Sequence, residues 1–306
     1  MFFWQKPSRL RCELTNICNH RCVMCGIWAE TPKVTLDLEL FDRLLGDRVL
    51  DAVRVLSLTG GEPFALPNLA DYYEVARRRH RRAHINISSN GWYTARALEL
   101  FERVRPRNTS LTISYDGFAS HDSIRGVDGS TERLLETARN VQREFPEVTL
   151  SLKMVVTNDN HREILDTARE ADELGVAFRL KTLEKLKCHQ SRSPSEVSEP
   201  DYADDVVGSI ADQARRLLDL GVETNSSYLK KLLRMSEGKT VSCNCSPRTL
   251  FVGVDGKVFL CRRKEEIGNV HDRSLDGIWQ SAARTVMLSR MRHCQGGLFS
   301  LSYVNV

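Results

Sequence analysis

Residues 15–25 read Thr-Asn-Ile-Cys-Asn-His-Arg-Cys-Val-Met-Cys and set Cys18, Cys22 and Cys25 in a Cys-x3-Cys-x2-Cys spacing. Three thiolates on one short loop can each bind one iron of a four-iron cluster, which leaves the fourth iron without a protein ligand. Such an iron can bind a cofactor instead of only passing electrons. The spacing differs from that of zinc sites, in which two Cys-x2-Cys or Cys/His pairs complete a tetrahedron.

A second motif lies downstream of this loop. Residues 59–63 read Thr-Gly-Gly-Glu-Pro and follow the apolar run Val53–Leu58. The cysteine loop and this motif, in this order, resemble the signature of the radical S-adenosylmethionine (SAM) superfamily. The resemblance implies that the three cysteines hold a [4Fe-4S] cluster with SAM, and that the second motif lies against the methionine amino group of SAM. The residues implied by this motif are Gly60, Gly61, Glu62 and Pro63.

The composition is that of an ordinary globular protein, with 306 residues of which 41% are hydrophobic and 27% charged. No apolar run reaches the ~18 residues that a membrane span needs, and the apolar start Met1–Trp4 is too short for a signal peptide. A net charge of +4 does not argue for nucleic acid as a partner. Nine cysteines in a chain without an export signal indicate metal or redox chemistry in a reducing, cytoplasmic setting.

Apolar β-type runs alternate with amphipathic helical stretches over the first 220 residues. The expected strands are Arg9–Thr15, Val53–Leu58, His84–Ser88, Ser110–Ser114, Thr149–Val156 and Ala177–Thr182. The expected helices are Leu36–Leu45, Asn68–Arg79, Ala95–Glu102, Thr131–Glu144, Arg162–Leu174 and Tyr202–Leu220. Consecutive βα units predict an α/β fold with a parallel sheet, outer helices and chemistry at the carboxyl ends of the strands. Periodicity alone does not separate a barrel from a doubly wound sheet, and the resemblance implies the partial (β/α)6 barrel of the family.

Polar turns follow the third and fourth expected strands. Residues 88–91 read Ser-Ser-Asn-Gly, and residues 114–117 read Ser-Tyr-Asp-Gly. Taken alone, Asn-Gly and Asp-Gly pairs are ordinary turn dipeptides, but the resemblance implies that side chains here face SAM. It also implies that Arg125 pairs with the SAM carboxylate through its bidentate fork, and that Met24 packs on adenine. The residues implied at these turns are Ser89, Asn90, Ser114 and Asp116.

The C-terminal part carries a second group of cysteines, which are Cys243, Cys245, Cys261 and Cys294. Their spacing resembles the SPASM and twitch extensions, which carry auxiliary four-iron clusters. In one interpretation all four cysteines bind one auxiliary [4Fe-4S] cluster. In the other only three bind, and either Cys243 or Cys245 is a free thiol near the substrate or the cluster has an open iron. Four cysteines near a hairpin also suit zinc, but the upstream loop favours a cluster.

Local signals place these cysteines on secondary structure. Asp255-Gly256 lies between Leu250–Val254 and Lys257–Leu260, which predicts a hairpin, and a helix is expected over Ser274–Arg290. We expect a barrel core at 1–200, a helical connection at 201–242 and a small twitch/SPASM-like iron–sulfur domain at 243–306. Lys185–Pro200 is expected to be a loop at the end of the core, and Cys12 is expected to pack as a small apolar residue.

The resemblance implies an enzyme that cleaves SAM reductively and abstracts a hydrogen with a 5′-deoxyadenosyl radical. The cysteine loop begins at Cys18 without a preceding leader-binding module, which favours a small polar natural product of the kind found in antibiotic biosynthesis, such as an aminoglycoside, sugar or nucleoside. The expected reaction is epimerisation, with Cys243 or Cys245 as hydrogen-atom donor, or dehydrogenation, with the auxiliary cluster as electron acceptor. A flavodoxin- or ferredoxin-type reductant is the expected partner. The alternative is a peptide maturase that forms thioethers, crosslinks or D-residues in a ribosomal precursor.

Overall fold

The computed structural model describes residues 6–183, 202–222, 224–239, 241–242, 248–262, 264–292 and 295–296. Most described strands belong to one curved sheet, in the order β10-β9-β8-β1-β2-β3-β4-β5-β6. The six strands of the core are β1 Arg9–Glu13, β2 Val55–Thr59, β3 His84–Ser89, β4 Thr109–Ser114, β5 Val148–Val156 and β6 Ala177–Thr182, and each is parallel to its neighbour. This sheet order confirms the predicted parallel arrangement.

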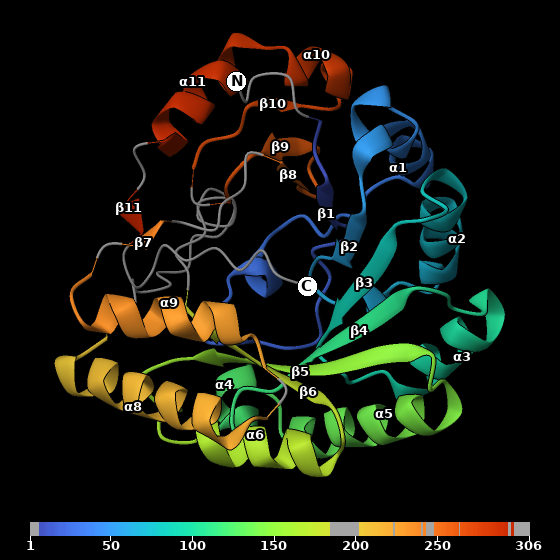
Figure 1. Cartoon of the computed structure of the whole chain (residues 1–306). Helices are drawn as coiled ribbons and strands as arrows, with labels where there is room; N and C mark the ends of the chain where they lie inside the picture. The colour runs from blue at the N-terminus through green and yellow to red at the C-terminus, as the bar shows by residue number, and fades with distance from the viewer. Residues whose placement is uncertain are drawn as a thin grey trace.

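Helices cover the convex side of the sheet, as Figure 1 shows for α1, α2, α3, α5, α6 and α8. The helices of the core are α1 Leu38–Leu45, α2 Leu69–Arg79, α3 Thr94–Val104, α4 His121–Arg125, α5 Ser130–Glu144, α6 Ile164–Glu173, α8 Asp204–Leu220 and α9 Ser226–Ser236. Short 3-10 turns occur at η1 Ile27–Ala29, η2 Arg48–Ala52 and η3 Pro63–Ala65. The six predicted strands and six predicted helices are therefore confirmed within a few residues, whereas α4 and α9 were not predicted as separate helices.

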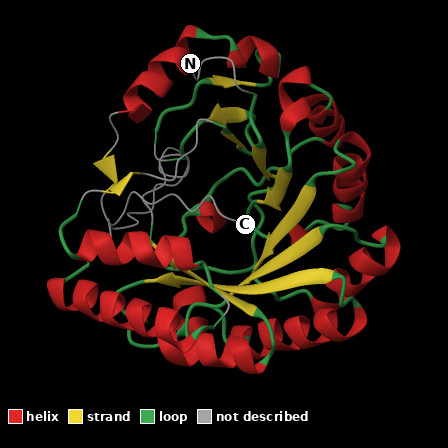
Figure 2. Ribbon diagram, in the orientation of Figure 1, coloured by secondary structure: helices red, strands yellow, loops and turns green. Residues whose placement is uncertain are grey.

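The two faces of the sheet differ in polarity because side chains alternate along each strand. Leu10 and Cys12 on β1, like Phe178 and Leu180 on β6, are buried in the hydrophobic core that the outer helices complete. This burial confirms the packing role predicted for Cys12. The opposite, concave face carries polar side chains such as Asn86. Figure 2 shows that this concave face is turned away from the helical layer.

The C-terminal part continues the same sheet through a hairpin of β8 Thr249–Val252 and β9 Lys257–Phe259. Strand β8 pairs in parallel with β1, in a register that sets Arg9 opposite Thr249 and Cys12 opposite Val252. The hairpin turn contains Gly256 at φ 77°, a left-handed conformation that suits glycine. The predicted hairpin is confirmed, and it also docks on the first strand of the core. The proposed boundaries of the domains stay a prediction.

The remaining elements are β7 Val241–Ser242, β10 Gly268–Asn269, α10 Leu275–Trp279, α11 Ala282–Arg292 and β11 Gln295–Gly296. The prediction of one continuous helix over Ser274–Arg290 was wrong. The Ser281 hydroxyl accepts a hydrogen bond from the backbone N–H of Arg284 at 3.2 Å, so a new helix begins where the first one ends. None of the helices that the structure describes is both long and apolar enough to cross a bilayer.

Candidate active site

The loop of residues 15–25, the cluster loop, connects β1 to the rest of the core and is fixed at both ends. At its start, the Asn16 side chain accepts a hydrogen bond from the Val34 backbone N–H at 2.7 Å, and the Asn16 N–H donates to the Val34 carbonyl at 3.1 Å. Further along, the Arg21 N–H donates to the Arg125 carbonyl at 3.0 Å and the Val23 N–H to the Ile124 carbonyl at 2.9 Å. The loop is therefore held by α4, an element far away in the sequence.

The Gly-Gly-Glu-Pro motif at the end of β2 supports the start of the cluster loop through backbone hydrogen bonds. The Gly61 N–H donates to the Thr15 carbonyl at 2.6 Å, and the Glu62 N–H donates to the Ile17 carbonyl at 2.8 Å. A Cβ atom at Gly61 would lie 2.2 Å from the Ile17 carbonyl oxygen, and one at Gly60 would lie 2.4 Å from the Thr15 carbonyl oxygen. Both glycines are required because two backbones meet here without room for a side chain.

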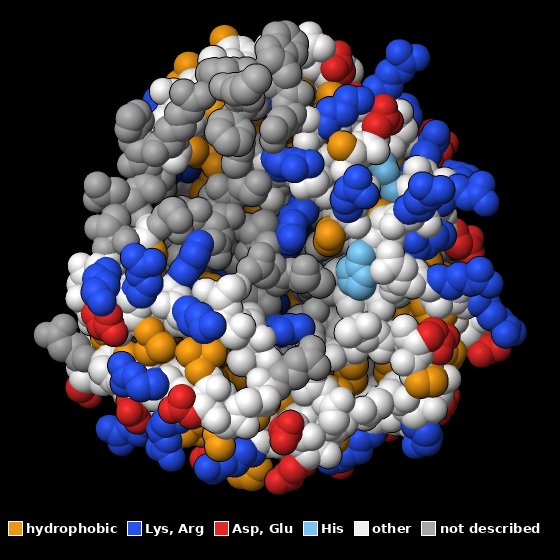
Figure 3. Space-filling model, in the orientation of Figure 1, with side chains coloured by type: hydrophobic (Ala, Val, Ile, Leu, Met, Phe, Trp, Pro, Cys, Tyr) orange, Lys and Arg blue, Asp and Glu red, His pale blue; other side chains and the backbone are white. Residues whose placement is uncertain are grey.

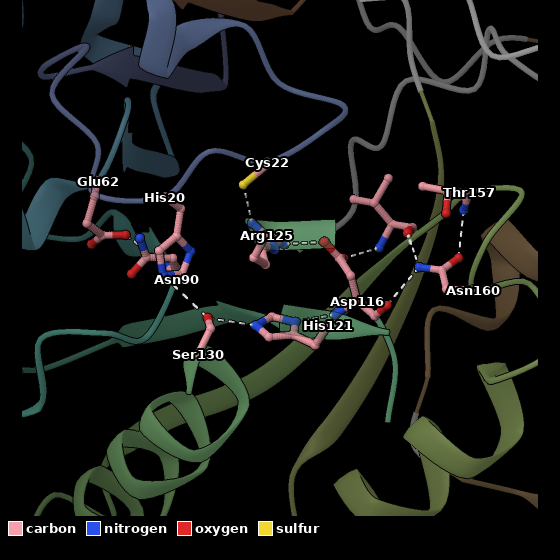
Figure 4. A network of polar contacts seen from close by, with 11 residues as sticks. His20, Cys22, Glu62, Asn90, Asp116, His121, Arg125, Ser130, Thr157 and Asn160 are labelled. Atoms are coloured by element: carbon pink, nitrogen blue, oxygen red, sulfur yellow. Dashed lines mark hydrogen bonds and ion pairs between the residues drawn. The ribbon is translucent and has the colours of Figure 1, made fainter. Parts of the chain in front are cut away.

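The Glu62 carboxylate is fully buried and organises the end of β3. It accepts hydrogen bonds from the Phe64 N–H at 3.0 Å, the Ser89 hydroxyl at 2.9 Å and the Asn90 N–H at 2.6 Å. Burial raises the pKa of Glu62 to about 7, although these hydrogen bonds oppose the shift. Asn90 in turn donates to the Asn19 side chain of the cluster loop at 2.8 Å. The polar turn after β3 therefore contacts both motifs, and Figure 4 shows Asn90 beside Glu62.

The three thiols of the cluster loop are Cys18 and Cys25, which are partly buried, and Cys22, which is buried. Burial is the largest cause that raises the pKa of Cys18 to about 12 and of Cys25 to about 11. A cluster that binds these sulfurs must therefore displace protons. No three His, Cys, Asp or Glu side chains in the described part of the chain converge on one point as the ligands of a single metal ion would. A four-iron cluster does not require this, since each thiolate binds a different iron.

Arg125, at the end of α4, links the cluster loop to β4. Its guanidinium lies 2.6 Å from the Asp116 carboxylate, in an ion pair whose acid is fully buried, and it donates to the Cys22 sulfur at 3.5 Å. Its Nε is buried and has no hydrogen-bond partner among the described residues. The Nε–H group is thus available to an anion such as the predicted SAM carboxylate, while the two terminal nitrogens contact Asp116 and Cys22. The role of Arg125 toward SAM stays a prediction.

A chain of buried polar side chains surrounds this ion pair and was not identified from the sequence. His121 accepts a hydrogen bond from the Asp116 N–H at 2.9 Å, and its other nitrogen lies 3.1 Å from the Ser130 hydroxyl. That hydroxyl lies 3.4 Å from His20 of the cluster loop. Asn160 donates to the Asp116 carbonyl at 2.8 Å. Figure 4 shows these groups arranged between the cluster loop and the ends of β4 and β5. The one feature of the sequence that could have indicated these polar contacts is His20, a histidine inside the cysteine loop.

Three further predicted residues also lie near this site. Ser114 is the last residue of β4 and stands opposite Lys153 of β5. Met24 is partly buried on the cluster loop, and Pro63 is the buried first residue of η3. The structure therefore brings the predicted residues of the core to the carboxyl ends of β1 to β4, as expected for a parallel sheet. Their contacts with SAM stay predictions.

The C-terminal cysteines are described only in part. Cys261 is buried and follows β9, whereas Cys243, Cys245 and Cys294 lie outside the described residues, as does Lys185–Pro200. The next residue, Arg262, lies 3.1 Å from the carboxylate of Glu13 on β1 in a largely buried ion pair. The segment that carries Cys261 is thereby anchored beside the start of the cluster loop.

Comparison with known proteins agrees with this geometry. The family model of the Radical SAM superfamily matches residues 12–171. The chain belongs to this superfamily. A second model, the iron-sulfur cluster-binding SPASM domain, matches residues 243–296. As a radical SAM protein with a SPASM domain, the chain uses SAM with a [4Fe-4S] cluster and carries auxiliary iron–sulfur binding in its C-terminal part. The three thiols and the spare Nε of Arg125 provide donors that fit such a cluster and an anionic group beside it.

The relatives of this radical SAM protein differ in activity. It is 26% identical over 299 residues to the AdoMet-dependent heme synthase of Methanosarcina barkeri, covering 90% of this chain and 83% of that protein. It is 27% identical over 172 residues to the PqqA peptide cyclase of Gluconobacter oxydans, covering 56% of this chain and 47%, less than half, of that protein. The fold is similar to Streptococcus suis SuiB bound to the precursor peptide SuiA, with a TM-score of 0.71, 13% identity and coverage of 97% and 71%.

Proposed function

We propose that this radical SAM enzyme abstracts a hydrogen atom from a small polar molecule and so catalyses an epimerisation or a dehydrogenation. The observation that carries the proposal is the polar concave face of the sheet, whose strands β2 and β4 end next to Glu62 and Asp116. When bound, the cluster and SAM supply a 5′-deoxyadenosyl radical. The chain's own residues orient the reactants and exclude water. The buried ion pair of Asp116 and Arg125 holds α4 to the end of β4, and backbone hydrogen bonds hold α4 against the cluster loop.

The similarity to a heme synthase supports a small-molecule substrate. That similarity extends over 90% of this chain and includes the C-terminal part, whereas the match to the peptide cyclase covers 56%. A reducing, cytoplasmic setting and a flavodoxin- or ferredoxin-type reductant belong to the same proposal. The proposed function involves neither a membrane nor a nucleic acid as a partner.

The outcome of the reaction depends on the fate of the substrate radical after hydrogen abstraction. An epimerisation requires a hydrogen-atom donor on the opposite face of the substrate carbon, and we assign this role to whichever of Cys243 and Cys245 does not bind the auxiliary cluster. A dehydrogenation requires an acceptor for the electron of the substrate radical, and we assign this role to the auxiliary cluster. Turnover in deuterium oxide separates the two routes. A solvent-exchangeable thiol donor places deuterium in the product, whereas an oxidation leaves the product without it.

A peptide maturase is the alternative function. The similarities to a PqqA peptide cyclase and to the fold of a structure that contains a precursor peptide support it. Binding of a precursor peptide encoded beside this protein, measured with the cluster-loaded enzyme and SAM, would favour the maturase over a small-molecule enzyme.

The first experiment is a test of SAM cleavage. Anaerobically reconstituted enzyme with dithionite is expected to release 5′-deoxyadenosine, and a Cys22→Ala variant is expected to release none, because one cluster ligand is then lost. Failure of the wild-type enzyme to release 5′-deoxyadenosine, at full iron content, would contradict the proposal and favour a cluster protein without turnover.

A further inference from the structure

A groove on the surface of the protein lies between α2 and the segments that lead into β3 and β4. It encloses about 680 Å³, which is within the roughly 300–1,000 Å³ of pockets that bind small molecules. Most such pockets are lined mainly by apolar side chains, whereas this outer groove is rich in arginine. Its charged and amide side chains are Glu74, Arg77, Arg78, Arg81, Arg107 and Asn108.

The outer groove and the predicted SAM site lie at opposite ends of the same two strands. Arg81 comes shortly before β3 and Arg107 shortly before β4, whereas Ser89 and Ser114 are the last residues of these strands. Each strand has six residues, which span about 17–20 Å at ~3.3 Å per residue. A ligand in the outer groove would therefore not contact SAM, and the groove is no part of the candidate active site.

Arg77 of α2 connects the two walls of the outer groove. On one side its guanidinium donates to the carbonyls of Arg81 at 3.2 Å and Ala83 at 2.8 Å. On the other side it donates to the carbonyls of Arg107 at 2.5 Å and Asn108 at 3.4 Å. Its Nε is buried and has no hydrogen-bond partner among the described residues. The walls are thus held together by a cation that forms no ion pair with a described carboxylate.

The wall formed by residues 104–108 has an unusual backbone. Within the described part of the chain, Arg105 at φ 47° and Asn108 at φ 49° are the only non-glycine residues with positive φ. Such conformations are uncommon, and they gather at functional sites such as ligand clamps. The Asn108 side chain donates to the Arg82 carbonyl at 3.3 Å and lies 3.0 Å from Nδ1 of His84. The wall is therefore preformed, which lowers the cost of binding a ligand.

Positive charge exceeds negative charge in the outer groove. Glu74, the one carboxylate in its lining, already accepts hydrogen bonds from Arg103 of α3 at 3.0 and 3.1 Å. The exposed side chains of Arg81 and Arg107 make neither a hydrogen bond nor an ion pair with any residue that the structure describes. Figure 3 shows Lys and Arg side chains gathered at the right of the view, over α1, α2 and α3 of Figure 1. The groove thus presents guanidinium groups without carboxylate partners.

We propose that the outer groove binds a small molecule with two or more phosphate groups, such as a nucleoside diphosphate or a sugar bisphosphate. The planar guanidinium group binds phosphate through two parallel charge-assisted hydrogen bonds. Arg81 and Arg107 belong to different walls, so that each can bind one phosphate group of the same ligand. This binding site is additional to the proposed function and does not depend on it.

The test is a calorimetric titration of the cluster-loaded enzyme with ADP and with fructose 1,6-bisphosphate. Saturating SAM is present, so that adenine compounds are kept out of the predicted SAM site, and no reductant is added. Adenosine and a single-stranded RNA are titrated beside them. We expect saturable binding of ADP, of the bisphosphate or of both, and none of adenosine. Binding of both identifies a site for phosphate groups alone, and binding of ADP alone identifies a nucleotide site.

Matched variants locate the binding. Arg81→Met and Arg107→Met are each expected to weaken it by about tenfold or more, because a charge-assisted hydrogen bond is lost. The control is Arg105→Met, since Arg105 lies on the same wall segment but pairs with Glu102 at 3.5 Å and does not line the groove. All three side chains are exposed, so the variants are expected to fold, and circular dichroism checks this. Arg77 is left unchanged because its hydrogen bonds hold the walls.

Three results would overturn the inference. The first is that neither phosphate compound binds saturably. The second is that Arg105→Met weakens binding as much as Arg81→Met and Arg107→Met, as non-specific attraction to a basic surface would. The third is that the RNA binds more tightly than both compounds and loses this affinity in the same variants, which would make the groove a nucleic-acid surface.

Release of 5′-deoxyadenosine with dithionite separates this inference from the proposed function. Arg81→Met and Arg107→Met are expected to release as much as the wild-type enzyme, because the groove lies at the other end of the strands from the predicted SAM site. An enzyme that cleaves SAM but binds neither phosphate compound contradicts only the binding site proposed here. An enzyme that binds them but does not cleave SAM contradicts only the proposed function.

Discussion

Arg125 and Asp116 form a buried ion pair that joins α4 to the end of β4 directly beneath the cluster loop. The two side chains lie 2.6 Å apart, and the acid is completely inaccessible to solvent. The guanidinium also reaches Cys22 at 3.5 Å. The Arg125 side chain therefore connects the polar turn after the fourth strand, the helix that comes after it and a predicted cluster ligand.

Replacement of Arg125 by Met is expected to destabilise the protein by about 3–5 kcal/mol, because the buried Asp116 carboxylate then has no cation. Urea unfolding under anaerobic conditions measures the loss. The double variant Asp116→Asn/Arg125→Met removes the stranded charge and should recover part of it. Additive losses in the double-mutant cycle would mean that the pair is not coupled.

Substitution of Gly61 by Ala is expected to lower iron incorporation strongly, because the new Cβ would lie 2.2 Å from the Ile17 carbonyl and displace the cluster loop. Gly208→Ala is the matched control, since Gly208 lies within α8 with open space around it. The control is expected to raise stability by about 0.5–1 kcal/mol through helix propensity, without affecting iron content. Iron and sulfide analysis compares the iron content of the two variants, and urea unfolding measures the stability of the control. Normal iron content in Gly61→Ala would show that this motif does not support the cluster loop.

Glu62→Gln is expected to weaken SAM binding, because the amide presents N–H groups where the carboxylate accepts from Ser89 and Asn90. A buried donor facing another donor costs about 1–3 kcal/mol, so the dissociation constant measured by equilibrium dialysis is expected to rise by about tenfold. Unchanged SAM affinity would show that the turn after β3 does not contribute to the SAM site.

The triple variant Cys18→Ala/Cys22→Ala/Cys25→Ala is expected to retain about four of about eight irons after reconstitution, because the C-terminal cysteines keep the auxiliary cluster. A variant without iron, beside a wild type with about four irons, would mean that these cysteines bind zinc or remain free thiols. Dehydrogenation through an auxiliary cluster would then be excluded.

Stability is expected to rise with pH between about 7 and 10.5 through Lys153. Desolvation, with Lys181 and Arg11, lowers the pKa of this lysine to about 7 from an ordinary 10.5. The folded chain thus binds fewer protons than the unfolded chain in this range, and the free energy of unfolding increases with pH. Lys153→Met should remove this part of the increase in urea unfolding at several pH values. An identical pH dependence in the variant would contradict the shift.

Much of the fold was predictable because its signals are local. The apolar runs and helix periods located β1 to β6 and six of the core helices, since each depends on residues a few positions apart. The helix break at Ser281 was missed because a single side-chain cap overrides the helical pattern there. The short helix α4 was missed because it has little periodicity over five residues.

The sequence by itself determined the family and the cysteine loop, since both depend on residue types at fixed spacing in one segment. Only the tertiary structure revealed that α4 and the Gly-Gly-Glu-Pro motif hold that loop, and that Arg125 contacts Asp116 and Cys22. It also assembled Lys153, Arg179 and Lys181 on one face. These relationships depend on strand register and on contacts between residues up to about one hundred positions apart, and no local pattern in the chain encodes such distances.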